Sequence, residues 1–186
     1  VKLWLPCIVG NRIIESNEVS KRFKDDFVDV LTSLFAENYY GYMEQLAEQS
    51  APGMRLLIEP YGTGGQKPFR VLDIHKILSQ TPHSLVATEF WVKPNWGWRD
   101  MQGHEKVMRK LQKPLLIAEA FTCWPLFAWQ DCPQSLKTIC DRAFCTGVNK
   151  MMLHAGACNP WKNVEPGMSF GIWGTQFVPT QTWWKA

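Results

Sequence analysis

The sequence has little net charge and lacks the motifs of several common ligand classes. The formal charge is +3, and no block of basic residues alternates with aromatic ones. We therefore expect neither nucleic-acid nor membrane-surface binding. No run approaches the roughly 20 apolar residues that a bilayer span requires. The first residue is not Met and no signal-type segment follows it, so we expect a processed chain or a piece of a longer one.

Two further classes of site lack support. The six cysteines include no CxxC pair and no paired His spacing, so neither a zinc site nor a redox motif is indicated. We expect Cys140 and Cys145, on a predicted helix, to be free, buried thiols. The Gly-rich stretch after Glu59 lacks GxGxxG and a following Lys-Ser/Thr pair, which argues against a phosphate-binding loop.

The composition is otherwise that of an ordinary globular domain. With 186 residues, 46% apolar and 20% charged, the chain is long enough for one well-buried core, and we expect a single domain over residues 1–186. The ten Trp residues are unusual, because each offers a flat apolar face with a polar handle. Such faces suit sugar rings and protein cores alike.

Three apolar segments each lead into a glutamate. They are Leu56–Glu59, Leu85–Glu89 and Leu115–Glu119. The glutamates stand 30 residues apart, which is about the length of one βα unit. Short apolar runs of this kind are typical of buried parallel strands. The sequence therefore predicts three carboxylates on one face of a parallel sheet.

Helical patterns separate these strands. We predict helices over about 18–49, 71–79, 102–112 and 133–145, and strands over 54–58, 85–89, 115–122 and 148–153. Ser16 or Asn17 can cap the first helix, its Phe stripe is expected in the core, and Gly41 can bend it. Pro6 makes residues 1–9 an edge strand or an irregular entry. The aromatic-rich tail, residues 158–186, is expected to be a functional loop or lid.

This order predicts an α/β fold with parallel strands and crossover helices, a partial or small TIM-type (β/α) barrel. A closed eight-stranded barrel typically needs about 250 residues. A partial barrel, a barrel that closes by dimerisation and a smaller open sheet all remain compatible with the pattern. Exposed strand edges would favour self-association into a homo-oligomer.

Ligands of such sheets bind at the carboxyl ends of the strands, where Glu59, Glu89, Glu119 and His154 are expected. Two carboxylates flanking a sugar carbon are the minimum for glycoside hydrolysis, at about 5 Å for retention and about 6.5–9.5 Å for inversion. Two alternatives stay open. Each glutamate can be a structural acceptor, or the three can bind Mg²⁺ or Ca²⁺ through oxygen.

Aromatic residues are predicted to surround the same edge. Loops at this face carry side chains that we expect to line the sugar subsites together with His154: Tyr61, Trp96, Trp98, Trp124, Trp129 and Trp173. The expected ligand is therefore a carbohydrate.

Several segments resemble glycoside hydrolase family 106, the α-L-rhamnosidase-like enzymes. They are ENYYGY (37–42), EPYG (59–62), TEFW (88–91), AEAFT (118–122), DRAFCTGVNKMMLH (141–154) and PGMSFGIWGTQFVPTQTWW (166–184). The resemblance covers nearly the whole chain in the same order. It implies the C-terminal part of a (β/α)₈ catalytic domain that acts through two carboxylates and is assisted by Ca²⁺.

The resemblance also implies roles for single residues. Glu119 in AEAFT resembles the catalytic base, Glu89 in TEFW resembles an active-site carboxylate, and Glu59 belongs to the EPYG turn. The family's general acid would precede Val1, so within this chain Glu89 is the expected acid, with Glu59 in support. Cys158 stands where the family has a second His.

Substrate preference could accordingly have moved, for example to β-glucosides. Two rival functions are a carbohydrate-binding remnant without turnover and a metal-dependent hydrolase that uses the glutamate cluster.

Overall fold

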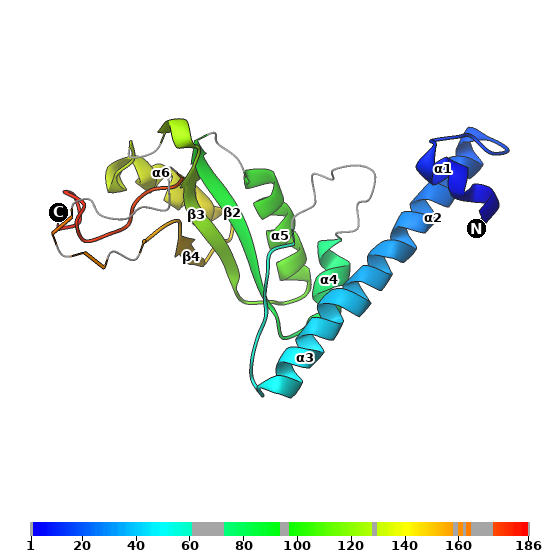
Figure 1. The fold of residues 1–186 in the computed structure, drawn as a ribbon, viewed down its shortest axis with the longest axis horizontal. Helices are drawn as coiled ribbons and strands as arrows, with labels where there is room; N and C mark the ends of the chain where they lie inside the picture. The colour runs from blue at the N-terminus through cyan, green and yellow to red at the C-terminus, as the bar shows by residue number, and fades with distance from the viewer. Residues whose placement is uncertain are drawn as a thin grey trace. The chain divides into compact units, whose positions relative to one another are not determined.

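The computed structural model describes residues 2–60, 73–93, 97–127, 130–157, 160–161, 163–164 and 173–185. The chain forms two compact units, one from residues 1–56 and 62–84, the other from residues 57–61 and 85–186. The first unit is helical and the second contains the sheet (Figure 1).

The N-terminal segment of the first unit is helical. A 3₁₀ turn, Lys2–Trp4, leads into α1, Leu5–Val9, so the prediction of a strand or irregular entry was wrong. Pro6 lies in the first turn of α1, where its missing N–H costs no hydrogen bond. The ring of Trp4 packs on Phe23 at a centroid distance of 5.4 Å, which ties this segment to the next helix.

The long N-terminal helix is confirmed. It consists of α2, Asn17–Phe35, a π-helical turn, Ala36–Gly41, and α3, Tyr42–Ser50. The Ser16 hydroxyl caps α2 by accepting a hydrogen bond from the Val19 N–H at 3.2 Å, as the sequence predicts. The π-helical turn ends at Gly41, the residue at which we expected a bend.

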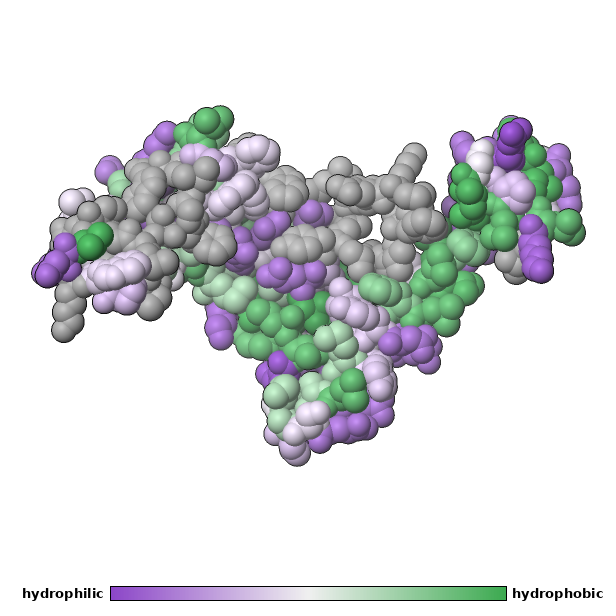
Figure 2. Space-filling model, viewed as in Figure 1, coloured by the Kyte–Doolittle hydropathy of each residue, from purple (hydrophilic) through white to green (hydrophobic). Residues whose placement is uncertain are grey.

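Part of the apolar stripe on this helix is exposed rather than in the core. The exposed apolar side chains on it are Val30, Leu34, Tyr39, Tyr42, Met43 and Leu46, and green patches along the helix mark apolar residues in Figure 2. Spacing alone shows that a helix is amphipathic, but which side becomes covered depends on what packs against it. The phenylalanines that we expected in the core, Phe23, Phe27 and Phe35, are half-buried.

The rest of the first unit is α4, Ile74–Gln80, which Asp73 caps by accepting a hydrogen bond from the Lys76 N–H at 3.0 Å. The predicted helix over 71–79 is thus present with a later start. The buried Glu44 carboxylate of α3 accepts hydrogen bonds from the Ser84 hydroxyl at 2.5 Å and the His83 N–H at 3.1 Å, so its buried charge is satisfied.

The second unit is built on a four-stranded parallel sheet. Its strands are β1, Leu57–Ile58, β2, Leu85–Lys93, β3, Leu116–Cys123, and β4, Lys150–Leu153, and they lie in the order β1-β2-β3-β4. Neighbours in space are neighbours in sequence, with helices in the crossovers, as in part of a (β/α) barrel. The predicted fold class is confirmed. β2 runs four residues past Glu89, so that glutamate lies within the strand and not at its end.

Two helices pack beside this sheet, α5, Trp98–Lys110, and α6, Pro133–Cys145 (Figure 1). α6 begins and ends where the sequence predicts, with Pro133 in its first turn and Gly147 following it at φ +107°. α5 begins earlier than predicted, because Trp98 opens the helix instead of belonging to a loop. A short 3₁₀ turn, Pro125–Phe127, follows β3.

The cysteines of the described chain are all free. Cys145 is exposed and Cys140 is half-buried, so the prediction of two buried thiols on α6 was wrong. The Cys140 thiol lies 3.9 Å from the Met151 sulfur of β4, whereas Cys145, five residues later, is on the solvent side of the helix. Among the described helices, none is both long enough and apolar enough to cross a membrane.

Candidate active site

Two carboxylates lie side by side on neighbouring strands. Glu89 of β2 pairs directly with Glu119 of β3, and Glu119 pairs with Met152 of β4. Residues paired across parallel strands point to the same face of the sheet, about 4.8 Å apart between strands. The two glutamates therefore share one face, and both side chains are half-buried there.

The opposite face of the sheet is the packed one. The residues of β2 that point away from Glu89 are all buried: Val86, Thr88, Phe90 and Val92. The ring of Phe90 stacks on Trp98 of α5 at 5.4 Å, so the helices cover this face. The glutamates consequently point away from the helices, toward what would be the interior of a (β/α) barrel.

A β-bulge at Phe121 sets which side chain meets Glu119. Phe90 pairs with Ala120 and Trp91 with Thr122, so Phe121 is an extra residue in β3. Its φ of +70° is uncommon for a bulky residue and costs backbone energy. The bulge turns Thr122 to the face of Glu119, where its hydroxyl donates a hydrogen bond to the carboxylate at 2.5 Å.

Glu89 has a matching partner two residues further along β2. Trp91 shares its face, and the Trp91 side chain favours the charged form of Glu89. Burial is the larger effect and raises the pKa of Glu89, and the negative charges of Glu119, Glu59 and Asp100 raise it further. The protonated form of Glu89 is therefore stabilised relative to an ordinary glutamate.

Glu59 directly follows the last paired residue of β1, Ile58, and its charge acts on Glu89. The chain just beyond it is fixed by His104 of α5. Nε2 of this buried imidazole lies 3.1 Å from the Pro60 carbonyl oxygen, and Nδ1 lies 2.6 Å from the Asp100 carbonyl oxygen. Burial lowers the pKa of His104, although both backbone contacts favour its protonated form. Glu59 thus follows β1, whereas Glu89 and Glu119 lie within β2 and β3, four residues before each strand ends.

Three tryptophans meet beyond the carboxylates. The centroid distances are 6.4 Å for Trp91 and Trp124, 6.0 Å for Trp91 and Trp173, and 6.1 Å for Trp124 and Trp173. Trp124 is 49% exposed and Trp173 is 38% exposed, so both present ring surface to solvent. They come from the end of β3 and from the C-terminal tail. Trp91, the third member, was not among the predicted site residues.

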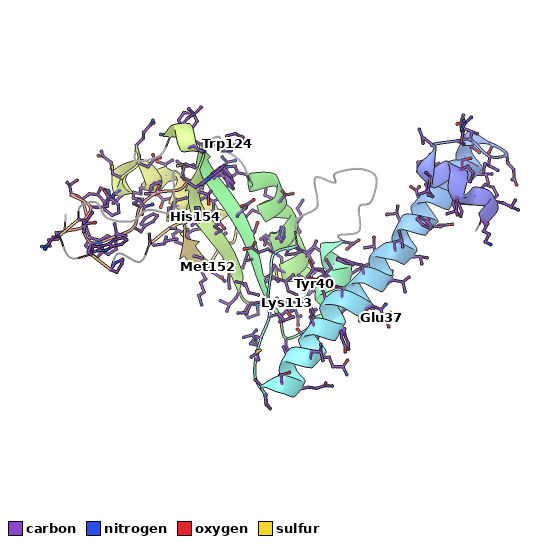
Figure 3. All side chains as sticks on the ribbon, viewed as in Figure 1. Glu37, Tyr40, Lys113, Trp124, Met152 and His154 are labelled. Carbon is purple, nitrogen blue, oxygen red and sulfur yellow. The ribbon has the colours of Figure 1, made fainter. Side chains whose placement is uncertain are left out.

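His154 follows β4 and lies beside the end of β3 (Figure 3). Its N–H donates to the Ala120 carbonyl at 2.9 Å, and its own carbonyl accepts from the Thr175 N–H at 3.0 Å. The tail therefore closes over the carboxyl end of β4 and brings Trp173 with it.

The remaining predicted aromatic residues are placed differently or are not described. Trp98 is 8% exposed, and its ring lies between Phe90 and the Arg142 guanidinium, which is 4.1 Å from the ring centroid. It packs on the face opposite the glutamates, so we no longer place it in a sugar subsite. Tyr61, Trp96 and Trp129 lie outside the described residues.

Within the described ranges, no three carboxylate, imidazole or thiolate groups converge as a metal site. Ca²⁺ takes six to eight oxygen ligands, which the described side chains of Glu59, Glu89 and Glu119 do not supply by themselves.

Sequence reasoning missed Thr122 and Trp91 as partners of the carboxylates. Trp91 could have been found, because it stands two residues after Glu89 and so shares its face in a strand. Thr122 stands three residues after Glu119, which in a regular strand puts it on the opposite face. The bulge at Phe121 turns Thr122 to the face of Glu119, and no residue pattern in the sequence predicted the bulge.

Parallel strands with crossover helices define this chain as part of a (β/α) barrel-type fold. The family model described as alpha-L-rhamnosidase, glycoside hydrolase family 106, matches residues 1–186. The chain therefore belongs to glycoside hydrolase family 106, as the resemblance in the sequence implied.

Two known proteins are similar over almost the full chain. A protein of Formosa agariphila named "Putative beta-glucuronidase" is 29% identical over 183 residues, which are 98% of this chain and 14% of that protein. The solved rhamnosidase of Novosphingobium sp. PP1Y is 25% identical, with a TM-score of 0.79 over 99% of this chain and 17% of its own. The chain thus spans about a sixth or less of either relative.

Proposed function

We propose that this chain carries the carboxylate pair of an α-L-rhamnosidase-like glycoside hydrolase. The observation that supports the proposal is the direct pairing of Glu89 with Glu119 on one half-buried face of the sheet. Glycoside hydrolysis needs two carboxyl groups on one substrate, of which one is protonated and one ionised.

The surroundings of the two groups support a different role for each. Burial and neighbouring negative charge raise the pKa of Glu89, which suits a general acid. Glu119 accepts a hydrogen bond from the Thr122 hydroxyl at 2.5 Å, which fixes the position of this carboxyl group beside Glu89. In this proposal Glu89 protonates the leaving oxygen, and Glu119 acts as base on water or as nucleophile. The negative charge of Glu59 raises the pKa of Glu89 further.

The substrate is a carbohydrate, with the exposed rings of Trp124 and Trp173 as stacking surfaces and His154 as a polar contact. The Novosphingobium relative is named as a rhamnosidase, so an α-L-rhamnoside is the first choice of sugar. The name of the Formosa relative makes a β-glucuronide the second sugar to test, and β-glucoside is the third.

The test is hydrolysis of aryl α-L-rhamnoside, β-D-glucuronide and β-D-glucoside by the 186-residue chain and its variants Glu119→Gln and Glu89→Gln. Loss of acid or base catalysis should lower the rate by about 10²–10⁴-fold in each. Glu37→Gln, an exposed position on the long helix of the first unit (Figure 3), should keep the wild-type rate. A wild-type rate that survives both active-site changes would refute the carboxylate mechanism.

A second candidate is carbohydrate binding without turnover. The cluster of Trp91, Trp124 and Trp173 favours it, because exposed stacked rings bind sugars whether or not a reaction follows. A sugar-induced change in Trp fluorescence without any product would identify this function. Turnover that disappears with a chelator would instead favour the metal-dependent hydrolase.

A further inference from the structure

Backbone hydrogen bonds join the tail segment 173–178 to the turn that follows β4. The Ala155 N–H donates to the Thr175 carbonyl at 2.9 Å, and the Phe177 N–H donates to the Ala155 carbonyl at 3.1 Å. These two bonds hold the residues on either side of Gln176 against Ala155. Gln176 therefore lies beside the residues that follow β4.

These bonds put the segment at the edge of the sheet that carries the candidate active site. The Gly174 N–H donates to the Cys123 carbonyl at 3.3 Å, one residue after the Thr122 that bonds Glu119. Gly174 has φ +77°, and a Cβ there would lie 2.5 Å from the His154 carbonyl oxygen and 2.7 Å from Nδ1. The backbone thus passes directly against His154, and only glycine allows so close an approach.

Gln176 is the unusual residue of this segment. It is 4% exposed, yet its buried Oε1 has no hydrogen-bond partner within the described chain. An amide removed from water without a partner destabilises the folded state, and such groups are rare in folded proteins. A ligand that supplies the missing hydrogen bond would account for it.

The pleat determines which side of the sheet Gln176 faces. The ring of Phe177 packs on Phe121 at 5.7 Å, and Phe121 packs on Phe90 at 5.2 Å, so Phe177 belongs to the helix-covered side. Successive residues of an extended segment point to opposite sides. Gln176 therefore faces the same side as Glu119.

We propose that Gln176 is a sugar-recognition residue, whose amide pairs with hydroxyl groups of a glycoside bound beside Glu119. This inference rests on the proposed function, since it names a specificity residue of the same site. A side-chain amide offers an acceptor oxygen and an NH₂ donor, which together match two adjacent hydroxyls of a neutral sugar. Its contribution is selectivity, because a site built to bond a hydroxyl rejects the analogue that lacks it.

The test measures binding by intrinsic Trp fluorescence and by calorimetry, independently of turnover. The probes are methyl α-L-rhamnoside, methyl β-D-glucuronide and methyl β-D-glucoside, followed by the monodeoxy analogues of whichever binds best. The wild type should bind one deoxy analogue about tenfold to a hundredfold more weakly than the parent sugar. Gln176→Leu should bind the parent sugar as weakly as the wild type binds that analogue. The variant should no longer distinguish the parent sugar from that analogue, but it should still distinguish the parent sugar from the other deoxy analogues.

Two controls separate recognition from a structural role. Gln176→Leu replaces an unpartnered buried amide by an apolar group of similar size, so its unfolding temperature should equal or exceed that of the wild type. Thr175→Val changes the neighbouring residue, which is equally buried and has an unpartnered hydroxyl, on the opposite side of the segment. It should bind every sugar as the wild type does.

Unchanged affinity and discrimination in Gln176→Leu would overturn the assignment. So would an equal loss in Thr175→Val, or a wild type that binds none of the sugars. Sugar binding that depends on Gln176 without any hydrolysis would refute the carboxylate mechanism and leave this inference standing. Hydrolysis whose rate and sugar preference are unchanged in Gln176→Leu would refute this inference and leave the carboxylate mechanism standing.

Discussion

Gly97 gives the sharpest test of how the helix start is fitted to the strand that carries Glu89. Its φ is +93°, and a Cβ built on it would lie 2.2 Å from the Glu89 carbonyl oxygen and 3.0 Å from the Phe90 Cα. Gly97→Ala therefore combines two costs. A left-handed conformation costs an alanine about 1–2 kcal/mol, and displacing packed backbone costs about 1–3 kcal/mol. We expect the free energy of unfolding to fall by about 2–5 kcal/mol.

Two other glycines separate these costs. Gly53 has φ +84° with nothing within 4 Å of its Cβ position, and Gly147 has φ +107° with the Glu105 side chain as its neighbour. An alanine at Gly53 should cost only about 1–2 kcal/mol, and one at Gly147 little more, because a side chain can move. The assay is urea unfolding followed by Trp fluorescence. If Gly97→Ala lowers the free energy of unfolding no more than Gly147→Ala does, the close contact of Gly97 with the Glu89 backbone is refuted.

Three further predictions follow from the same contacts. Thr122→Val should lower the turnover number roughly tenfold to a hundredfold, since a hydrogen bond to a charged group contributes about 1.5–3 kcal/mol. Thr146→Val, which removes a hydroxyl at the end of α6, is the control and should keep the wild-type turnover number. Equal rates in the two variants would contradict a role for the Thr122 hydroxyl. The pKa of Glu89 is raised and that of His104 is lowered in the folded chain, so stability should fall as pH rises above about 4.5 and, through His104, as pH falls below about 6.5. In urea titrations Glu89→Gln should remove the first loss and His104→Gln the second, and unchanged profiles would count against both shifts. The apolar side chains exposed on the long helix should drive self-association at micromolar concentration, and a monomer in sedimentation would contradict this.

The sequence predicted the features that follow from local chemistry. The strand and helix order came from apolar spacing, and the parallel sheet came from their alternation. α6 was predicted to the residue, because Pro133 and Gly147 are strong signals at helix ends. The pairing of Glu89 with Glu119 agrees with their separation of 30 residues, whereas Glu59, at the same separation from Glu89, is two residues out of register because Ile58 pairs with Val86.

Features that depend on tertiary context could not be predicted in the same way. The position of Trp98 was misjudged, because a turn-rich sequence does not reveal that a ring inserts between Phe90 and Arg142. The exposed half of the long helix had the same spacing as its buried half. The contact of the tail with Ala155 joins segments about 20 residues apart through backbone hydrogen bonds, which leave no trace in side-chain pattern.

The bulge at Phe121 shows why a strained residue can persist beside a carboxylate. In a regular strand with this sequence, Phe121 would point to the face of Glu119 and Thr122 to the helices. The bulge exchanges the two. Phe121 becomes 5% exposed, which is worth about 1.5–3 kcal/mol for a buried aromatic side chain, against a strain of about 1–3 kcal/mol at its φ. Burial of the Phe121 ring therefore offsets most of the backbone strain. The packing of this ring can thus stabilise the bulge, and the bulge places the Thr122 hydroxyl on Glu119.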